Sequence, residues 1–288
     1  MEKSKKALVL GGKTGLLGQD LVLALNQAGW EVIAPARDEL DIFSTSLLTD
    51  FIKKQQVDCI FNTIAYTQVE QAEEDVEQAK KLNQVFPALL GRVSASLNLY
   101  LIHYSTDFVF DGQKKIPYEP EDSTNPLNVY GQTKLAGENA LLTIEDLSCL
   151  IIRTAWLFGK GKPNFVSKIL ALAKERESLN VVHDQVGSPT YTWDLARYSL
   201  ALVEKQARGV FHVVNAGQAS WCELAQEAVR CLGLSCKIVP ISSQEYPQRA
   251  KRPGYSVLSV DKFIQVTQQK PRAWAQALRE YVYQSYLE

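Results

Sequence analysis

The chain has 288 residues, 46% of them hydrophobic and 22% charged, and its 31 basic and 32 acidic residues leave a net charge of −1. This length suffices for a large α/β domain with a smaller lobe. The balanced charge argues against nucleic acid and anionic membranes as partners. No apolar run reaches the length of a membrane span, and the start does not fit a signal peptide, so we expect a cytoplasmic protein. Five cysteines without CxxC spacing are expected to be free thiols: Cys59, Cys149, Cys222, Cys231 and Cys236.

Short apolar runs alternate with amphipathic helical stretches through the first half of the chain. The expected strands are 7–10, 31–34, 58–62, 99–105 and 150–153, and the expected helices are 15–29, 46–54, 76–97 and 130–142. Pro87 predicts a kink in the third helix, and the Pro-rich acidic tract 117–126 predicts a loop. This βαβαβ order predicts an α/β fold, a Rossmann-type doubly wound parallel sheet with helices on both faces.

The alternation becomes irregular after about Trp156. We therefore expect a dinucleotide-binding Rossmann domain over 1–155, to which a later segment of about 190–215 returns. The remainder, 156–288, is expected to form mainly a smaller C-terminal substrate-binding lobe.

A glycine-rich stretch, GGKTGLLG, follows the first predicted strand. A P-loop would need a glycine at position 7, where Ala7 stands inside the strand, so the spacing of a triphosphate site fails. Gly12, Gly15 and Gly18 instead give G-x-x-G-x-x-G between a strand and a helix. In a dinucleotide site the first glycine allows a tight turn, the second lets backbone approach a pyrophosphate, and the third lets helix and strand pack closely.

The end of the second predicted strand leaves the choice of cofactor open. A site selective for NAD usually has an acidic residue there, and here the chain continues Pro35-Ala36-Arg37. Arg37 can meet a 2′-phosphate, but acidic residues follow it, and a solvated charged turn fits equally well. We expect NADPH or NADH, with a weak preference for NADPH.

Tyr130 and Lys134 form the strongest catalytic signal, because their i, i+4 spacing places both on one helix face. A neighbouring ammonium lowers the pKa of a phenol from its usual value of about 10. Tyr130 is therefore predicted to act as general acid toward a carbonyl oxygen, and Lys134 also to hold a cofactor ribose. Ser105 and Thr106 close the fourth predicted strand, and a hydroxyl from either can stabilise charge on the same oxygen.

Several segments, in this order, resemble the extended, sugar-nucleotide branch of the short-chain dehydrogenase/reductase superfamily, and within it the dTDP-4-dehydrorhamnose reductases: GKTGLLGQ, ELDIF, AYTQVEQAE, YSTDFVFDG, NVYGQTK, RTAWLFGKGKPNFV, VHDQVGSPTYT and KRPGYSVL. The resemblance covers essentially the whole chain. It implies a catalytic triad of Thr106, Tyr130 and Lys134, and so selects Thr106 over Ser105. The implied reaction is NAD(P)H-dependent reduction of the C4 ketone of dTDP-4-dehydro-L-rhamnose to dTDP-L-rhamnose, for cell-surface polysaccharide.

The resemblance also implies the binding residues. The cofactor is expected to meet Gly12, Gly15, Leu16, Leu17, Gly18, Arg37, Asp41, Ile42, Ala65, Tyr66, Tyr130 and Lys134. The sugar nucleotide is expected to meet Thr67, Val69, Asp107, Phe108, Trp156, Asn164, Gln185 and Arg252. Glu70 stands where the family usually has aspartate, and Ala155 where serine is common.

A small-molecule sugar nucleotide is the expected partner, for a monomer or homodimer. Some relatives carry magnesium at a dimer interface, which the sequence does not place, and the three histidines lack ligand spacing, so no metal residue is predicted. Two alternatives stay open. One is another sugar-nucleotide reductase or epimerase on the same scaffold. The other is a non-catalytic regulatory subunit related to the partner of methionine adenosyltransferase, against which the retained triad argues.

Overall fold

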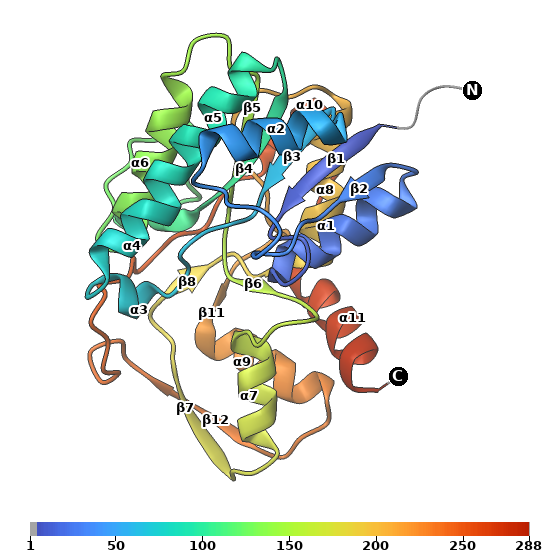
Figure 1. Ribbon diagram of the computed structural model, residues 1–288. Coiled ribbons are helices and arrows are strands. Elements are labelled where there is room, and N and C mark those ends of the chain that lie inside the picture. The colour runs from blue at the N-terminus through green and yellow to red at the C-terminus, as the bar shows by residue number, and fades with distance from the viewer. Residues whose placement is uncertain (1–4, 288) are drawn as a thin grey trace.

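Six strands pair in parallel in the order β10-β5-β4-β3-β1-β2 (Figure 1). The computed structural model describes residues 5–287. The six strands are β1 (Lys6–Leu10), β2 (Glu31–Ile33), β3 (Cys59–Asn62), β4 (Tyr100–Thr106), β5 (Cys149–Thr154) and β10 (Gly209–His212). Strands β3, β4 and β5 are buried along their whole length, as expected for a parallel sheet covered on both faces. The predicted Rossmann-type doubly wound sheet is confirmed.

Helices cover both faces of this sheet. One face carries α1 (Leu16–Gln27), α8 (Thr192–Glu204) and α10 (Asp261–Thr267), whose apolar side chains share one core with even-numbered residues of β4. The other face carries α2 (Thr45–Gln55), α5 (Phe86–Ser96) and α6 (Val129–Leu142), which share a second core. Strand β10 and helix α8 come from the later part of the chain and complete the sheet domain.

The long helix predicted over 76–97 is interrupted. It consists of α4 (Val76–Lys80), a π-helical turn η1 (Lys81–Val85) and α5. Pro87 has no N–H to give to the carbonyl of Asn83, so the regular ladder cannot continue through this point. The predicted distortion is confirmed, and it lies in the turn before the proline.

The remaining elements build a smaller lobe, seen in the lower part of Figure 1. Its own apolar clusters bring together α7 (Phe165–Ala173), β7 (Ser178–Val182), α9 (Trp221–Cys231), β12 (Lys237–Ile241) and α11 (Trp274–Tyr286). Short pieces join the two parts: α3 (Val69–Ala72), the 3-10 turn η2 (Asp107–Val109), β6 (Leu157–Phe158), β8 (Val186–Gly187), β9 (Thr190–Tyr191) and β11 (Ala219–Ser220).

Two further expectations bear on compartment. The five cysteines are free, as predicted. Within residues 5–287, none of the helices combines the length and the apolar character that crossing a bilayer would take.

Candidate active site

The sheet order places a crossover between β1 and β3. The chain leaves β1 toward β2 on one side and returns to β3 on the other. The carboxyl ends of the strands at such a point form the ligand crevice of doubly wound folds. The glycine loop follows β1, and Thr106 is the last residue of β4, which is separated from β1 by β3. The predicted cofactor and catalytic segments therefore meet at one edge of the sheet.

The glycine loop is shaped by close backbone contacts. A Cβ on Gly18 would lie 2.2 Å from the carbonyl oxygen of Gly11, and one on Gly15 would lie 2.6 Å from it. The turn after β1 includes both Gly11 and Gly12, and Gly11 has the left-handed φ of +86° that favours glycine. Gly12 is required because a Cβ there would meet Ala34 at 2.8 Å.

Helix α1 begins directly after this loop without a side-chain N-cap. Its first backbone N–H groups, at Leu16 and Leu17, have no carbonyl one turn earlier to bind. Uncapped N–H groups at a helix N-terminus suit a phosphate. The loop and helix therefore fit the pyrophosphate of a dinucleotide.

Charged side chains surround the predicted ribose end of this site. Lys13 Nζ lies 3.0 Å from Glu39 Oε1, and the Glu39 carboxylate also accepts the backbone N–H of Ala36 at 2.6 Å. Arg37 is exposed. Asp41 accepts the backbone N–H of the residue two positions on, and Ile42 packs against the adjacent core. Of the acidic residues near the strand end, Glu39 is thus paired with Lys13.

A buried asparagine, which the sequence analysis missed, joins the segment that follows β3 to helix α6, which carries Tyr130 and Lys134. The Asn83 side chain accepts the backbone N–H of Tyr66 at 2.8 Å and donates to the Tyr66 carbonyl and the Thr133 hydroxyl, both at 3.1 Å. It is fully buried. The backbone of Tyr66, expected with Ala65 along the cofactor channel, is therefore held by Asn83. The sequence signal for this buried residue was an amide side chain inside the largely apolar stretch KKLNQVFPALL.

The three predicted catalytic residues lie at this same edge. Tyr130 is in the first turn of α6, and its ring meets that of Phe108 edge-on at 5.8 Å. Lys134, one turn later, is buried and donates to the Tyr104 carbonyl of β4 at 2.6 Å. Thr106 Oγ1 accepts the backbone N–H of Phe108 at 3.2 Å.

The electrostatics differ from the prediction. Burial raises the pKa of Tyr130 to about 12, a polar contact with the Thr106 hydroxyl opposes this, and the charge of Asp107 adds to it. The expected lowering by Lys134 is therefore wrong for this state, because the ammonium is directed at the carbonyl of Tyr104. Burial also lowers the pKa of Lys134 to about 8, against the opposing charge of Glu138. Lys134 is thus still mostly cationic at pH 7.

Glu138, one turn beyond Lys134, belongs to a buried ion pair that the sequence analysis also missed. Arg153 Nη2 lies 2.7 Å from Glu138 Oε2, and Arg153 Nη1 donates to the carbonyl of Pro120 at 3.1 Å. Both side chains are almost fully buried. The pair fixes the far end of the catalytic helix to β5 and to the loop 117–126.

Asp107 follows Thr106, and its side chain is buried. Its Oδ1 accepts from Thr106 Oγ1 at 3.1 Å, and its Oδ2 accepts from Ser256 Oγ at 2.6 Å. It forms no ion pair within residues 5–287. Burial raises the pKa of its carboxyl to about 7, against those two hydrogen bonds. The predicted sugar contact of Asp107 stays a prediction, and Ser256 is a partner that the sequence analysis did not find.

A segment of residues 249–259, which we call the strap, crosses the site. The Glu70 carboxylate accepts the backbone N–H groups of Arg249 and Ala250 and pairs with Arg252 Nη2 at 2.7 Å. Asn128, the N-cap of α6, donates to the carbonyl of Lys251 at 2.8 Å. The strap therefore reaches the start of the catalytic helix, and the predicted nucleotide ligand Arg252 is paired with Glu70.

Trp156 has an unusual backbone and a fixed ring. Its φ of +48° is in the left-handed region, which bulky residues rarely adopt. Its indole stacks on that of Trp221 at 3.5 Å between centroids and 3° between planes. A Cβ on Gly187 would lie 2.5 Å from the indole. Such strain is typical of functional positions.

The other predicted substrate residues differ in their exposure and in the hydrogen bonds that their side chains already make. Thr67 is exposed, and Val69 opens α3. Gln185 is buried and donates to Gln248 at 3.5 Å. The Asn164 amide caps α7, accepting from Ser167 N at 3.1 Å and donating to the Gly159 carbonyl at 2.9 Å. Asn164 is thus engaged in structural contacts.

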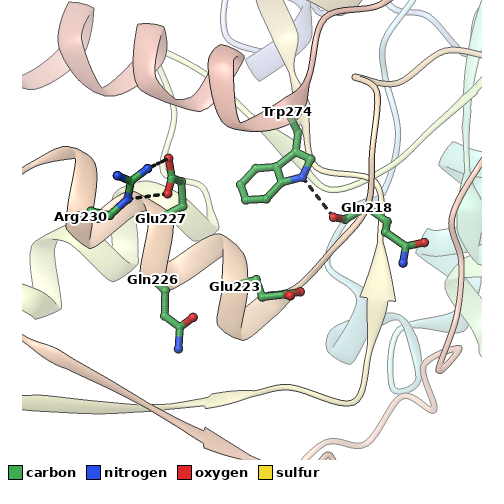
Figure 2. A pocket seen from close by; sticks show the side chains of 6 residues that line it. All are labelled: Gln218, Glu223, Gln226, Glu227, Arg230 and Trp274. Carbon is green, nitrogen blue, oxygen red and sulfur yellow. Dashed lines mark hydrogen bonds and ion pairs between the residues drawn. The ribbon is translucent and has the colours of Figure 1, made fainter.

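A separate open hollow of about 400 Å³ lies on the outer side of the smaller lobe, between α9 and the start of α11. Figure 2 shows its lining, with the Trp274 indole donating to the carbonyl of Gln218 at 3.1 Å and Arg230 paired with Glu227. None of the predicted site residues lines it.

No group of three or more His, Cys, Asp or Glu side chains within residues 5–287 is arranged to hold a metal ion.

The chain is similar to proteins of known sequence and structure over nearly its whole length. The profile of the RmlD substrate binding domain matches residues 5–287. The spore coat polysaccharide biosynthesis protein SpsK of Bacillus subtilis (strain 168) is 38% identical over 96% of this chain and 96% of its own. A dTDP-4-dehydrorhamnose reductase structure from Clostridium acetobutylicum ATCC 824 has a TM-score of 0.91 at 37% identity, covering 96% of this chain and 98% of its own. One from Bacillus anthracis str. Ames, in complex with NADP, has a TM-score of 0.94 at 30% identity, covering 98% and 100%.

Proposed function

The chain belongs to the RmlD substrate-binding domain family, and from this premise we propose that it is a dTDP-4-dehydrorhamnose reductase. The family resemblance seen in the sequence is thereby confirmed. The proposed reaction is the reduction of the C4 ketone of dTDP-4-dehydro-L-rhamnose to dTDP-L-rhamnose, with NADPH or NADH as the hydride donor. The observation that supports it most is the placement of Thr106, Tyr130 and Lys134 together at the carboxyl edge of the sheet, beside the glycine loop.

Each member of the triad has a chemical task. Bound nicotinamide supplies the hydride. Tyr130 gives its proton to the oxygen that gains charge, which is favourable because a positioned acid avoids a free alkoxide. Lys134, cationic at pH 7, stabilises the phenolate that results once its ammonium turns toward it. Thr106 holds the same oxygen with its hydroxyl.

NADPH is the proposed preferred cofactor. Lys13 neutralises Glu39, so this acid does not repel a 2′-phosphate, and the exposed Arg37 is available to meet it. The uncapped start of α1 would hold the pyrophosphate. The proposed sugar-nucleotide contacts are Thr67, Val69, Asp107, Phe108, Trp156, Asn164, Gln185 and Arg252. The five free thiols favour a reducing compartment, so we place the reaction in the cytoplasm.

The first experiment follows nicotinamide absorbance with dTDP-4-dehydro-L-rhamnose and either NADPH or NADH, and identifies the product. Oxidation matched by dTDP-L-rhamnose is expected, faster with NADPH. Tyr130→Phe should lower kcat at least 100-fold while cofactor binding survives. Wild-type-like turnover of that variant would remove Tyr130 from the acid role. Cofactor binding without oxidation in the unaltered protein would favour a different sugar nucleotide or a regulatory subunit.

A further inference from the structure

We propose that Trp221 is a positioning residue, whose indole holds the indole of Trp156 in place for the sugar of the bound nucleotide. This inference rests on the proposed reductase function and deepens it, because it names a residue on which recognition of the sugar depends. The role involves neither the glycine loop nor the proposed triad. Its loss is therefore expected to weaken binding of the sugar nucleotide and to spare binding of the cofactor.

Trp156 lies beside the proposed triad. Thr154, the last residue of β5, pairs with Thr106, the last residue of β4, and Trp156 follows two positions later. The Trp156 side chain is only partly buried, and it packs between an apolar cluster of the smaller lobe and a second cluster that includes Val109 and Phe110. The indole therefore stands at the carboxyl edge of the sheet, where doubly wound folds bind their ligands.

Little in its own segment fixes this indole. The left-handed φ of +48° is costly for a bulky residue and persists only where the surrounding structure imposes it. The Trp156 carbonyl accepts the backbone N–H of Thr190 at 3.2 Å, which holds the main chain but not the ring. Within residues 5–287 the indole N–H of Trp156 donates no hydrogen bond. The orientation of the ring is thus set by packing.

Two neighbours supply that packing. The Trp221 indole lies on the Trp156 indole with 3.5 Å between centroids and 3° between planes. Free aromatic pairs prefer offset or edge-on arrangements, so this face-to-face stack indicates that both rings are held by their surroundings. Gly187 lies at the edge of the same ring, where a Cβ would be 2.5 Å from Cε2 and 2.6 Å from Nε1 of Trp156. One face and one edge of the Trp156 indole are therefore covered.

Trp221 itself is fixed at the start of α9. Ser220 Oγ accepts the backbone N–H of Glu223 at 3.1 Å, and the Glu223 carboxylate accepts the backbone N–H of Ser220 at 2.7 Å, which is a reciprocal cap. Ser220 also pairs with Val186 in the β11–β8 ladder, and the Val186 carbonyl accepts the backbone N–H of Ser256 from the strap at 2.8 Å. The backbone of Trp221 is thus anchored in the smaller lobe and, through β8, to the strap.

The contacts that an indole offers a sugar depend on its orientation. A flat aromatic ring can pack against the apolar face of a sugar, and an indole N–H can donate to a sugar oxygen. Without Trp221 the Trp156 ring would sample other rotamers, and substrate binding would have to order it again. This cost applies equally to the bound substrate and to the transition state, so it raises KM and leaves kcat nearly unchanged.

Steady-state kinetics of Trp221→Leu test the role. The KM for dTDP-4-dehydro-L-rhamnose should rise about tenfold, as for the loss of one aromatic contact, while kcat and the dissociation constant for NADPH stay within about twofold. Trp221→Phe keeps an aromatic face and should have a KM within about threefold of the unaltered protein. Trp274→Leu, at a partly exposed tryptophan that lines the separate hollow of the same lobe, is the control and should change neither KM nor kcat. An unchanged KM in Trp221→Leu would overturn the proposal.

A double-mutant cycle separates positioning from a direct contact between Trp221 and the substrate. Trp156→Leu alone should raise the KM for the sugar nucleotide at least about tenfold. Adding Trp221→Leu to it should change the KM by less than about twofold, because Trp221 acts through a ring that is no longer there. A second rise of about tenfold would overturn the proposal, since Trp221 would then act independently of Trp156.

A third measurement needs no turnover. The protein is labelled with 5-fluorotryptophan, and the ¹⁹F resonance of Trp156, one of five tryptophans, is assigned by its loss in Trp156→Phe. Trp221→Leu should shift and broaden this resonance, because the ring loses its stacking partner and exchanges between rotamers. A resonance of unchanged position and width would contradict the positioning role. A shifted and broadened resonance, in a protein that does not turn over dTDP-4-dehydro-L-rhamnose, would refute the proposed substrate and still support the role of Trp221.

Discussion

At the scale of the residue, the site depends on charges whose partners are close. Lys13 and Glu39 illustrate this, since their pairing reduces the negative charge that a 2′-phosphate would meet at the predicted ribose end of the cofactor site. Arg37 is exposed and forms no ion pair with any residue of the described range 5–287. A surface arginine that meets a phosphate gives a charge-assisted contact that the phosphate-free cofactor cannot use.

Arg37→Ala should therefore raise the KM for NADPH about tenfold, as expected for losing about 1.4 kcal/mol of interaction, and leave that for NADH within twofold. Steady-state kinetics with both cofactors measure the effect. Arg92→Ala, an exposed arginine on α5, serves as the matched control and should change neither value. An equal rise for both cofactors would place Arg37 elsewhere than at the 2′-phosphate.

Buried histidine adds a dependence on pH. Burial lowers the pKa of His212 to about 3, while its Nδ1 bonds the Tyr118 carbonyl at 3.0 Å. Between pH 3 and 6.5 the unfolded chain binds more protons at His212 than the folded chain does. The contribution of neutral His212 to the free energy of unfolding is therefore complete above pH 6.5 and is lost on acidification.

The free energy of unfolding falls between pH 7 and pH 4, and replacing His212 by Asn should make this fall smaller by about 3 kcal/mol. Urea unfolding at both pH values measures this. His183→Asn, at an exposed histidine, is the control and should leave the profile unchanged. A profile equally steep in both variants would assign the acid sensitivity to other groups.

Residue types and spacing could predict Tyr130, Lys134 and the glycines, because these motifs are local in sequence. The partners of the same residues could not be predicted in this way. Ser256 is 149 positions from Asp107, and Asn83 is 50 from Thr133. The pKa of Tyr130 was misjudged for a related reason, since it depends on burial and on where the Lys134 ammonium points.

At the scale of the element, the catalytic helix is placed by two glycines. A Cβ on Gly131 would lie 2.2 Å from the carbonyl oxygen of Phe108, and one on Gly137 would lie 2.1 Å from that of Asn83. The first contact sets the helix against η2 beside Tyr130. The second lets it approach the π-helical turn. The missing side chains are thus what brings α6 close to both neighbours.

Gly131→Ala should push the start of α6 away from η2 and lower kcat at least tenfold, since a small misplacement of a reacting group is costly. The fold and cofactor affinity should survive, because the change is local. Turnover and cofactor titration separate the two effects. Gln132→Ala, the exposed neighbour on the same helix, should behave as the unaltered protein. Normal turnover of Gly131→Ala would show that α6 tolerates the shift.

The order of elements was recoverable through β5, where apolar runs and helical stretches alternate. Beyond Trp156 the strands β6, β8, β9 and β11 have two residues each, too few for a periodic signal. Their pairing partners come from distant segments, so only tertiary packing defines them.

At the scale of the whole molecule, Arg272 joins the C-terminal helix to the sheet domain. Its guanidinium bonds Asp194 of α8 at 2.7 and 2.8 Å, and it also pairs with Glu280 of α11. Asp194 is buried, whereas Arg272 is partly exposed. Removing the arginine would leave a buried carboxylate without its cation.

Arg272→Ala should destabilise the protein by about 2–3 kcal/mol, less than for a fully buried pair because solvent reaches the arginine. Thermal unfolding should show a Tm lower by roughly 3–5 °C for a chain of this length. Arg230→Ala removes a surface pair with Glu227 and should cost less than about 1 kcal/mol. Equal effects of the two substitutions would mean that the junction does not depend on Arg272.

The position of the strap late in the sequence also determines when some contacts of the site can form during translation. The glycine loop, Thr106 and Lys134 are translated before the strap, which supplies Ser256 and the partners of Glu70. The hydrogen bond from Ser256 to Asp107 and that from Asn128 to the Lys251 carbonyl therefore cannot form until the strap has been synthesised. A nascent chain stalled before residue 249 would hold every member of the proposed triad and yet lack these two contacts with the strap.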